Sequence, residues 1–150
     1  MKFVTWNVRR STDDKKCWEI FSALNPDIAV LQEVGKLPTY LEEKYQSIFK
    51  IPKSKTGKNQ KFSTYILTNG SVLGELRLSS EFDWVNKEYD FFSGNIVGYQ
   101  VSDKNGSLFN VLSIYSPAWC VPWDRLNGID VPKKSGWLGR EGASRILREA

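Results

Sequence analysis

Residues 1–34 contain two short apolar segments with an amphipathic segment between them, and this order restricts the fold more than any other feature. Lys2–Val8 and Asp27–Leu31 are therefore predicted to be buried β-strands. Four intervening apolar residues recur at the spacing of one helical face: Cys17, Ile20, Phe21 and Leu24. Ser11 or Thr12 is the expected N-cap of this helix, and Pro26 ends it. A strand, a helix and a strand in this order predict a βαβ unit with two parallel neighbouring strands.

The next part of the chain is predicted to be mostly β-structure. A short helix over Thr39–Lys44 leads into a strand over Tyr45–Lys50. Lys61–Thr68 has alternating polarity and is followed by an Asn-Gly dipeptide at residues 69–70, which is typical of hairpin turns. We therefore expect this strand to pair with Val72–Leu78.

The last third of the chain begins with a second expected hairpin. Phe91–Val101 and Ser107–Tyr115 are predicted strands that flank the turn residues at 103–106. Residues 116–139 are rich in Pro, Gly and Trp, which indicates a long loop of the kind that carries function. A helix is expected to begin in residues 142–150.

Composition excludes several classes of protein. The chain of 150 residues has the length of one domain, and it contains no histidine, so its residues offer no imidazole for acid–base catalysis. Its apolar runs are far shorter than the roughly 18 residues of a membrane helix, so no membrane partner is expected. Cys17 and Cys120 form no disulfide framework, and free thiols indicate a cytoplasmic location.

Positive charge is concentrated in residues 50–61 and again in residues 133–148. The formal net charge is +4, and residues 50–61 contain five lysines and no acid. A solvated loop is one explanation of this lysine run. The alternative is contact with a polyanion, for which Lys53, Lys55 and Lys58 are the candidate substrate-binding residues.

Polar side chains stand at the ends of both strands of the predicted βαβ unit. Asn7 follows the first strand, and Gln32 and Glu33 follow the second. Ligands of parallel sheets gather at the carboxyl ends of strands that lie about 4.8 Å apart, so Asn7 and Glu33 can share one site. A carboxylate there suits Mg²⁺, although a carboxylate at a strand end can also merely cap a loop.

Three segments in order and at matching spacing resemble the endonuclease/exonuclease/phosphatase superfamily: Thr5–Val8, Pro26–Val34 and Val111–Pro117. This group includes DNase I-like nucleases, exonuclease III-like abasic-site endonucleases and inositol polyphosphate 5-phosphatases. Ser63–Thr68 is similar to the central strand of the family but lacks the glycine that usually opens it.

The resemblance implies an α/β fold, the DNase I-like α/β sandwich, and roles for individual residues. Glu33 would be the ligand of Mg²⁺ (or Mn²⁺), Asn7 would contact the metal or the scissile phosphate, and Tyr115 would contact the phosphate. Trp119 and Trp123 would stack on bases or sugars. The alternative for Tyr115 and for both tryptophans is packing in the core or in a lid.

Two further motifs of the family, Gly-Asp-x-Asn and Ser-Asp-His, are absent from residues 1–150. The chain is thus expected to be an incomplete domain, about the first half of the fold, consisting of a mixed sheet with an outer helix layer and little of the second sheet. The inner face of that sheet, with Ile66, Val97 and Leu112, would then be uncovered and would promote self-association.

These features predict the N-terminal part of a Mg²⁺-dependent phosphodiester or phosphomonoester hydrolase, with an endo- or exonuclease as the leading hypothesis. We expect the 150-residue chain itself to catalyse little, because the acid/base partner is missing. One alternative is a non-catalytic module of the same fold that binds nucleic acid or a protein. Another is a phosphatase or lipid phosphodiesterase of the same superfamily.

Overall fold

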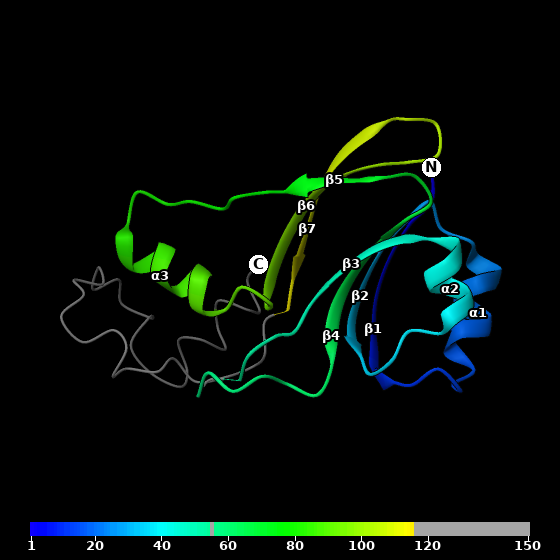
Figure 1. The fold of residues 1–150 in the computed structure, drawn as a ribbon, viewed down its shortest axis with the longest axis horizontal. Coiled ribbons are helices and arrows are strands. Elements are labelled where there is room, and N and C mark those ends of the chain that lie inside the picture. The colour runs from blue at the N-terminus through cyan, green and yellow to red at the C-terminus, as the bar shows by residue number, and fades with distance from the viewer. Residues whose placement is uncertain (55, 116–150) are drawn as a thin grey trace, which may run out of the picture. The chain divides into compact units, whose positions relative to one another are not determined.

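The computed structural model describes residues 1–54 and 56–115 of the protein, which form a mixed α/β structure with two β-sheets (Figure 1). The loop expected at 116–139 and the helix expected at 142–150 lie outside the described residues. The elements in chain order are β1 (Phe3–Ser11), α1 (Cys17–Leu24), β2 (Ile28–Val34), α2 (Thr39–Lys44), β3 (Gln46–Lys50), β4 (Ser63–Thr68), β5 (Val72–Glu75), α3 (Asp83–Phe91), β6 (Ile96–Ser102) and β7 (Leu108–Ile114).

The first sheet has the strand order β1-β2-β4-β3 and contains the predicted βαβ unit. β1 and β2 are parallel neighbours, with Thr5 opposite Val30, which confirms the prediction. β2 is buried on both faces because its alternate side chains face the helices and the second sheet. A continuous apolar run is the pattern that such a strand requires.

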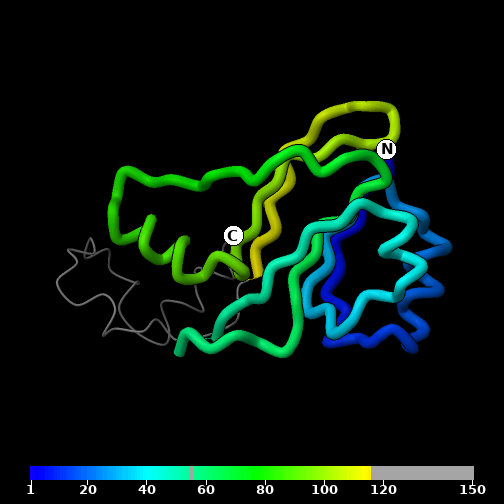
Figure 2. Tube along the Cα trace, in the orientation of Figure 1, coloured from blue at the N-terminus to red at the C-terminus, as the bar shows by residue number. Residues whose placement is uncertain are grey.

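Helices α1 and α2 cover one face of the first sheet (Figure 2). Phe21 of α1 is fully buried and makes edge-to-face contacts with Trp18 and Tyr45. The helix ends at Asn25 in the left-handed conformation, as expected before Pro26. The N-cap expected at Ser11 or Thr12 was wrong: β1 extends to Ser11, and the cap residue is Lys16, which makes no side-chain cap bond.

The second sheet has the strand order β5-β6-β7 and is antiparallel. β6 and β7 form the predicted hairpin, with Tyr99 opposite Val111. Asp103 shapes its turn because the Asp103 carboxylate accepts hydrogen bonds from the backbone N–H groups of Asn105 and Ser107, each at 2.9 Å.

The second sheet packs on the face of the first sheet that the helices leave open. The core between the sheets consists of Ile28, Val30, Ile66, Val97, Tyr99, Val101 and Val111. The expectation of an uncovered inner face was therefore wrong for Ile66 and Val97, which are 0% and 2% exposed. Leu112 is 47% exposed because it lies on the opposite face of β7 from Val111.

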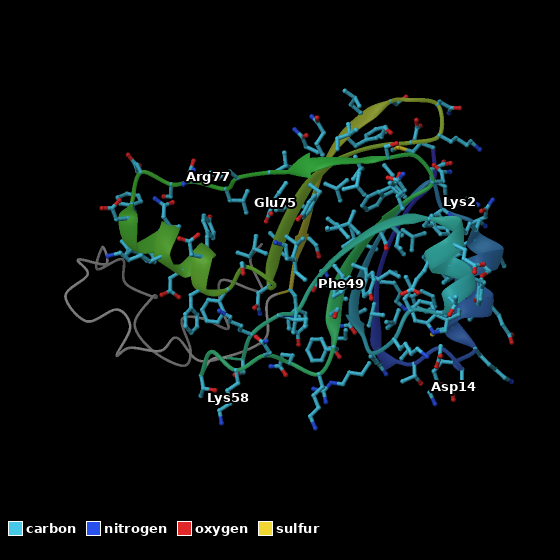
Figure 3. The ribbon with its side chains drawn as sticks, in the orientation of Figure 1. Lys2, Asp14, Phe49, Lys58, Glu75 and Arg77 are labelled. Atoms are coloured by element: carbon cyan, nitrogen blue, oxygen red, sulfur yellow. The ribbon has the colours of Figure 1, made fainter. Side chains whose placement is uncertain are left out.

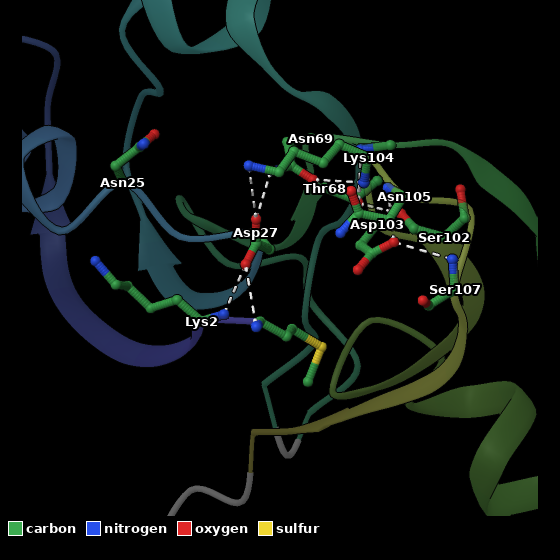
Figure 4. Close-up of polar contacts among 12 residues, drawn as sticks. Lys2, Asn25, Asp27, Thr68, Asn69, Ser102, Asp103, Lys104, Asn105 and Ser107 are labelled. Atoms are coloured by element: carbon green, nitrogen blue, oxygen red, sulfur yellow. Dashed lines mark hydrogen bonds and ion pairs between the residues drawn. The ribbon is translucent and has the colours of Figure 1, made fainter.

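The hairpin expected at residues 69–70 was also wrong. β4 already pairs with β2 on one side and with β3 on the other, so the chain crosses to the second sheet. Asn69 stabilises this crossing, since its amide donates to Asp27 at 2.8 Å and accepts from the backbone N–H of Lys104 at 3.0 Å (Figure 4). The Asp27 carboxylate also accepts from the backbone N–H of Lys2 at 2.7 Å, which ties the start of β1 to the same network.

Helix α3 was not predicted, and its segment was expected to be mainly β-structure or solvated acidic loop. Phe82, Val85, Tyr89 and Phe92 do recur at helical spacing, but none of the helix residues is buried. Phe91, which was expected to begin the next strand, ends this helix instead. None of the helices in residues 1–54 and 56–115 has the length and apolar character that a membrane crossing requires.

Candidate functional site

Asn7, Glu33 and Tyr115 lie together at one end of the two sheets. The Asn7 side-chain amide donates to Oε1 of Glu33 at 3.2 Å, and the Tyr115 hydroxyl donates to the same oxygen at 3.2 Å. Asn7 comes from β1, Glu33 from β2, and Tyr115 from the residue after β7. The three candidates that were separated by up to 108 positions in the sequence therefore form one hydrogen-bonded cluster.

Irregular backbone at the ends of β1 and β2 positions these side chains. The parallel register holds up to Asn7 and resumes only at Ser11, and Arg9 and Arg10 between them have positive φ angles of 52° and 59°. Glu33 also has a positive φ, of 55°, at a register shift between β2 and β4. Left-handed conformations cost energy in residues other than glycine and cluster at functional sites, so this edge is a candidate on backbone evidence alone.

The described residues hold the Glu33 carboxylate by one of its two oxygens. Its Oε1 atom accepts both hydrogen bonds of the cluster, whereas no donor from the described residues bonds to Oε2. Asn7 is fixed in turn, because its own side-chain oxygen accepts from the backbone N–H of Arg9 at 3.0 Å. Asn7 is therefore a positioning residue for the carboxylate in this arrangement, and its amide oxygen is already bonded.

Tyr115 connects the second sheet to this cluster. Its backbone N–H donates to the carbonyl of Asn95 at 2.7 Å, and its ring packs edge-to-face on Phe62 with the centroids 5.5 Å apart. Burial raises the pKa of the Tyr115 phenol, the Glu33 carboxylate raises it further, and the positive charge of Arg10 opposes this rise. The phenol consequently stays protonated at neutral pH and remains a hydrogen-bond donor.

Arg10 and Phe62 were not identified from the sequence. Phe62 is 3% exposed, and the Arg10 guanidinium lies over its ring, with Cζ 5.2 Å from the centroid. The two consecutive arginines at positions 9 and 10 were the available signal for Arg10. No local pattern indicates that Phe62 lies between Arg10 and Tyr115, since the three residues come from distant parts of the chain.

The lysine run is placed only in part. The backbone N–H of Lys53 donates to the side chain of Asn95 at 2.8 Å, and Asn95 in turn contacts Tyr115. The ammonium group of Lys53 lies 4.9 Å from the ring centroid of Phe91. Lys58 is exposed on the loop between β3 and β4 (Figure 3), and the described partners of the Glu33 carboxylate are Asn7 and Tyr115. The remaining candidates, Lys55, Trp119 and Trp123, lie outside the described residues.

Glu33 supplies the carboxylate of this cluster. Residues 1–54 and 56–115 contain no group of three or more His, Cys, Asp or Glu side chains that could together hold a metal ion. Comparison of the chain with protein-family models, with curated proteins and with solved structures found no match.

Proposed function

We propose that this chain is the N-terminal part of a Mg²⁺-dependent phosphoester hydrolase with a DNase I-like fold, and that its substrate is a nucleic acid. The observation that carries the proposal is the convergence of Asn7 and Tyr115 on one oxygen of Glu33, from two different sheets. The two face-to-face sheets, with helices on the outer face of one, also agree with such a sandwich.

The donor set fits a divalent cation. Glu33 offers a hard oxygen ligand whose Oε2 atom no described donor occupies, and Mg²⁺ commonly binds one or two carboxylates together with water and substrate phosphate. Bound at Glu33, Mg²⁺ would polarise a phosphoryl oxygen. The residues of the chain then have separate tasks: Asn7 orients the carboxylate, and the protonated Tyr115 hydroxyl can donate to a phosphate oxygen.

Metal binding can be tested without measuring catalysis. Titration with Mn²⁺ should broaden the NMR signals of the Asn7 side-chain amide and of Tyr115, because the paramagnetic ion relaxes nearby nuclei. Glu33→Gln should remove this broadening. Glu19→Gln, which removes an equal charge from an exposed position on α1, should preserve it. Equal broadening in both variants would contradict a metal site at Glu33.

Cleavage of supercoiled plasmid in Mg²⁺ tests the hydrolase part of the proposal. We expect little turnover by the 150-residue chain, since one carboxylate and one amide are few groups for a metal-dependent hydrolase. Robust cleavage that Glu33→Ala abolishes would show that the site is already complete, and the description of the chain as part of a larger enzyme would then be wrong.

A further inference from the structure

Arg10 lies beside the Glu33 cluster and contacts the ring of Phe62. The Arg10 guanidinium lies over the buried ring of Phe62 in a cation–π contact, with Cζ 5.2 Å from the ring centroid. The N–H donors of a guanidinium lie in its plane and point outward from its edges. A guanidinium over a ring therefore keeps its N–H donors available for an anion, and its planar fork is already arranged for hydrogen bonding.

Arg10 has no anionic partner among residues 1–54 and 56–115. None of the ion pairs among the described residues involves Arg10, although its side chain is exposed and carries a full charge. Phe62 contacts both Arg10 and Tyr115, and the Tyr115 hydroxyl bonds to Glu33. One buried ring thus contacts both Tyr115 of the proposed hydrolytic site and a planar cation that no described carboxylate pairs with.

We propose that Arg10 binds a phosphate of a nucleic-acid strand next to Glu33 and Tyr115. This inference rests on the proposed function and assigns its substrate contact. Planar N–H donors match the oxygens of a phosphodiester, and Arg is the usual residue for such recognition.

The charges around Phe62 favour a strand over a single phosphate. Arg9 precedes Arg10 in the same bulge, and Lys61 directly precedes Phe62; both are exposed. Lys58 lies on the same loop as Lys61. None of these three cations is ion-paired to a carboxylate in the part of the chain that the structure describes. Several cations in one bulge and one loop can contact successive phosphates, whereas one phosphate group needs only one or two.

The test is binding of a fluorescein-labelled oligothymidylate, measured by anisotropy at several salt concentrations in EDTA. A single phosphate contact contributes about 0.7 to the slope of log K against log salt for a single strand, which is about fivefold in affinity at 0.1 M salt. Arg10→Gln should therefore reduce the magnitude of the slope by about 0.7 and the affinity at 0.1 M salt by about fivefold. Arg10→Lys should keep the slope, because it keeps the charge.

Arg77→Gln is the matched control, since Arg77 is an exposed arginine beyond β5, on a different segment from the Glu33 cluster (Figure 3). It should leave affinity and slope unchanged. Thermal melts should show Arg10→Gln folded, because the side chain that it replaces is exposed.

Three results would overturn the inference: no binding by the wild-type chain, the same loss in Arg10→Gln as in Arg77→Gln, or a loss confined to inorganic phosphate as the probe. The third result would assign Arg10 to a single-phosphate substrate instead. Because the assay contains EDTA, it does not depend on a metal at Glu33, so this inference and the proposed function can fail separately.

Discussion

Replacing Ile66 by Ala tests whether the two sheets pack on each other as described. Ile66 is 0% exposed in β4 and belongs to the core between the sheets. The substitution removes the side-chain carbons beyond Cβ, worth about 0.8 kcal/mol each, so transfer alone costs about 2.4 kcal/mol. The cavity left behind adds to this loss, and we expect the free energy of unfolding to fall by about 3 kcal/mol. The melting temperature should fall by about 6–12 °C.

Urea denaturation followed by circular dichroism and by tryptophan fluorescence measures this loss. The control is Leu108→Ala, which truncates a leucine that is 61% exposed on β7 and should cost less than about 1 kcal/mol. Equal losses in the two variants would refute the packing of the sheets through Ile66. The site provides a second readout, because the Tyr115–Glu33 bond joins the two sheets and should weaken in Ile66→Ala.

Three further predictions concern the site and the start of the chain. Glu33→Gln should lower the pKa of Tyr115, because the substitution removes the carboxylate charge that raises this pKa. NMR titration of ring-labelled tyrosine measures the shift, and an unchanged pKa would contradict the contact between Tyr115 and Glu33. The backbone N–H of Lys2, and secondarily the amide of Asn69, lower the pKa of Asp27, so its stabilising effect should be complete above about pH 4 and be lost as the pH falls through the lowered value. Asp27→Asn should reduce the difference between urea midpoints at pH 7 and pH 3, and an undiminished difference would argue against this role. Gly35→Ala would place a Cβ 2.8 Å from the carbonyl oxygen of Arg10, so the free energy of unfolding should fall by about 1–3 kcal/mol and oligonucleotide binding should weaken. An unchanged urea midpoint would show that the backbone at Arg10 adjusts without cost.

Part of the candidate site followed from the sequence because it depends on neighbouring strands. Asn7 and Glu33 lie where the regular parallel pairing of the two strands of one βαβ unit stops, and parallel pairing brings these positions together. Tyr115 was assigned only from the resemblance of its segment to a known family. Its contact with Glu33 arises from the packing of the second sheet, which joins residues 82 positions apart.

Local patterns determined the elements whose apolar residues repeat at a regular spacing. The bounds of α2 at Thr39–Lys44, the parallel pairing of β1 with β2 and the β6–β7 hairpin all follow from such patterns or from turn residues. Helix α3 was missed although Val85 and Tyr89 lie at helical spacing in its sequence. None of its residues is buried, so α3 does not depend on the core that the other elements share.

The tertiary structure alone decided which strand pairs with which and what lies beside Glu33. The Asn-Gly turn at 69–70 would suit a hairpin, but both edges of β4 were already occupied, so competition for backbone hydrogen bonds moved the chain to another sheet. Likewise, the stack of Arg10 on Phe62 beside Tyr115 joins three distant segments. Contacts of this kind depend on how the two sheets pack, and no short-range pattern in a sequence encodes that packing.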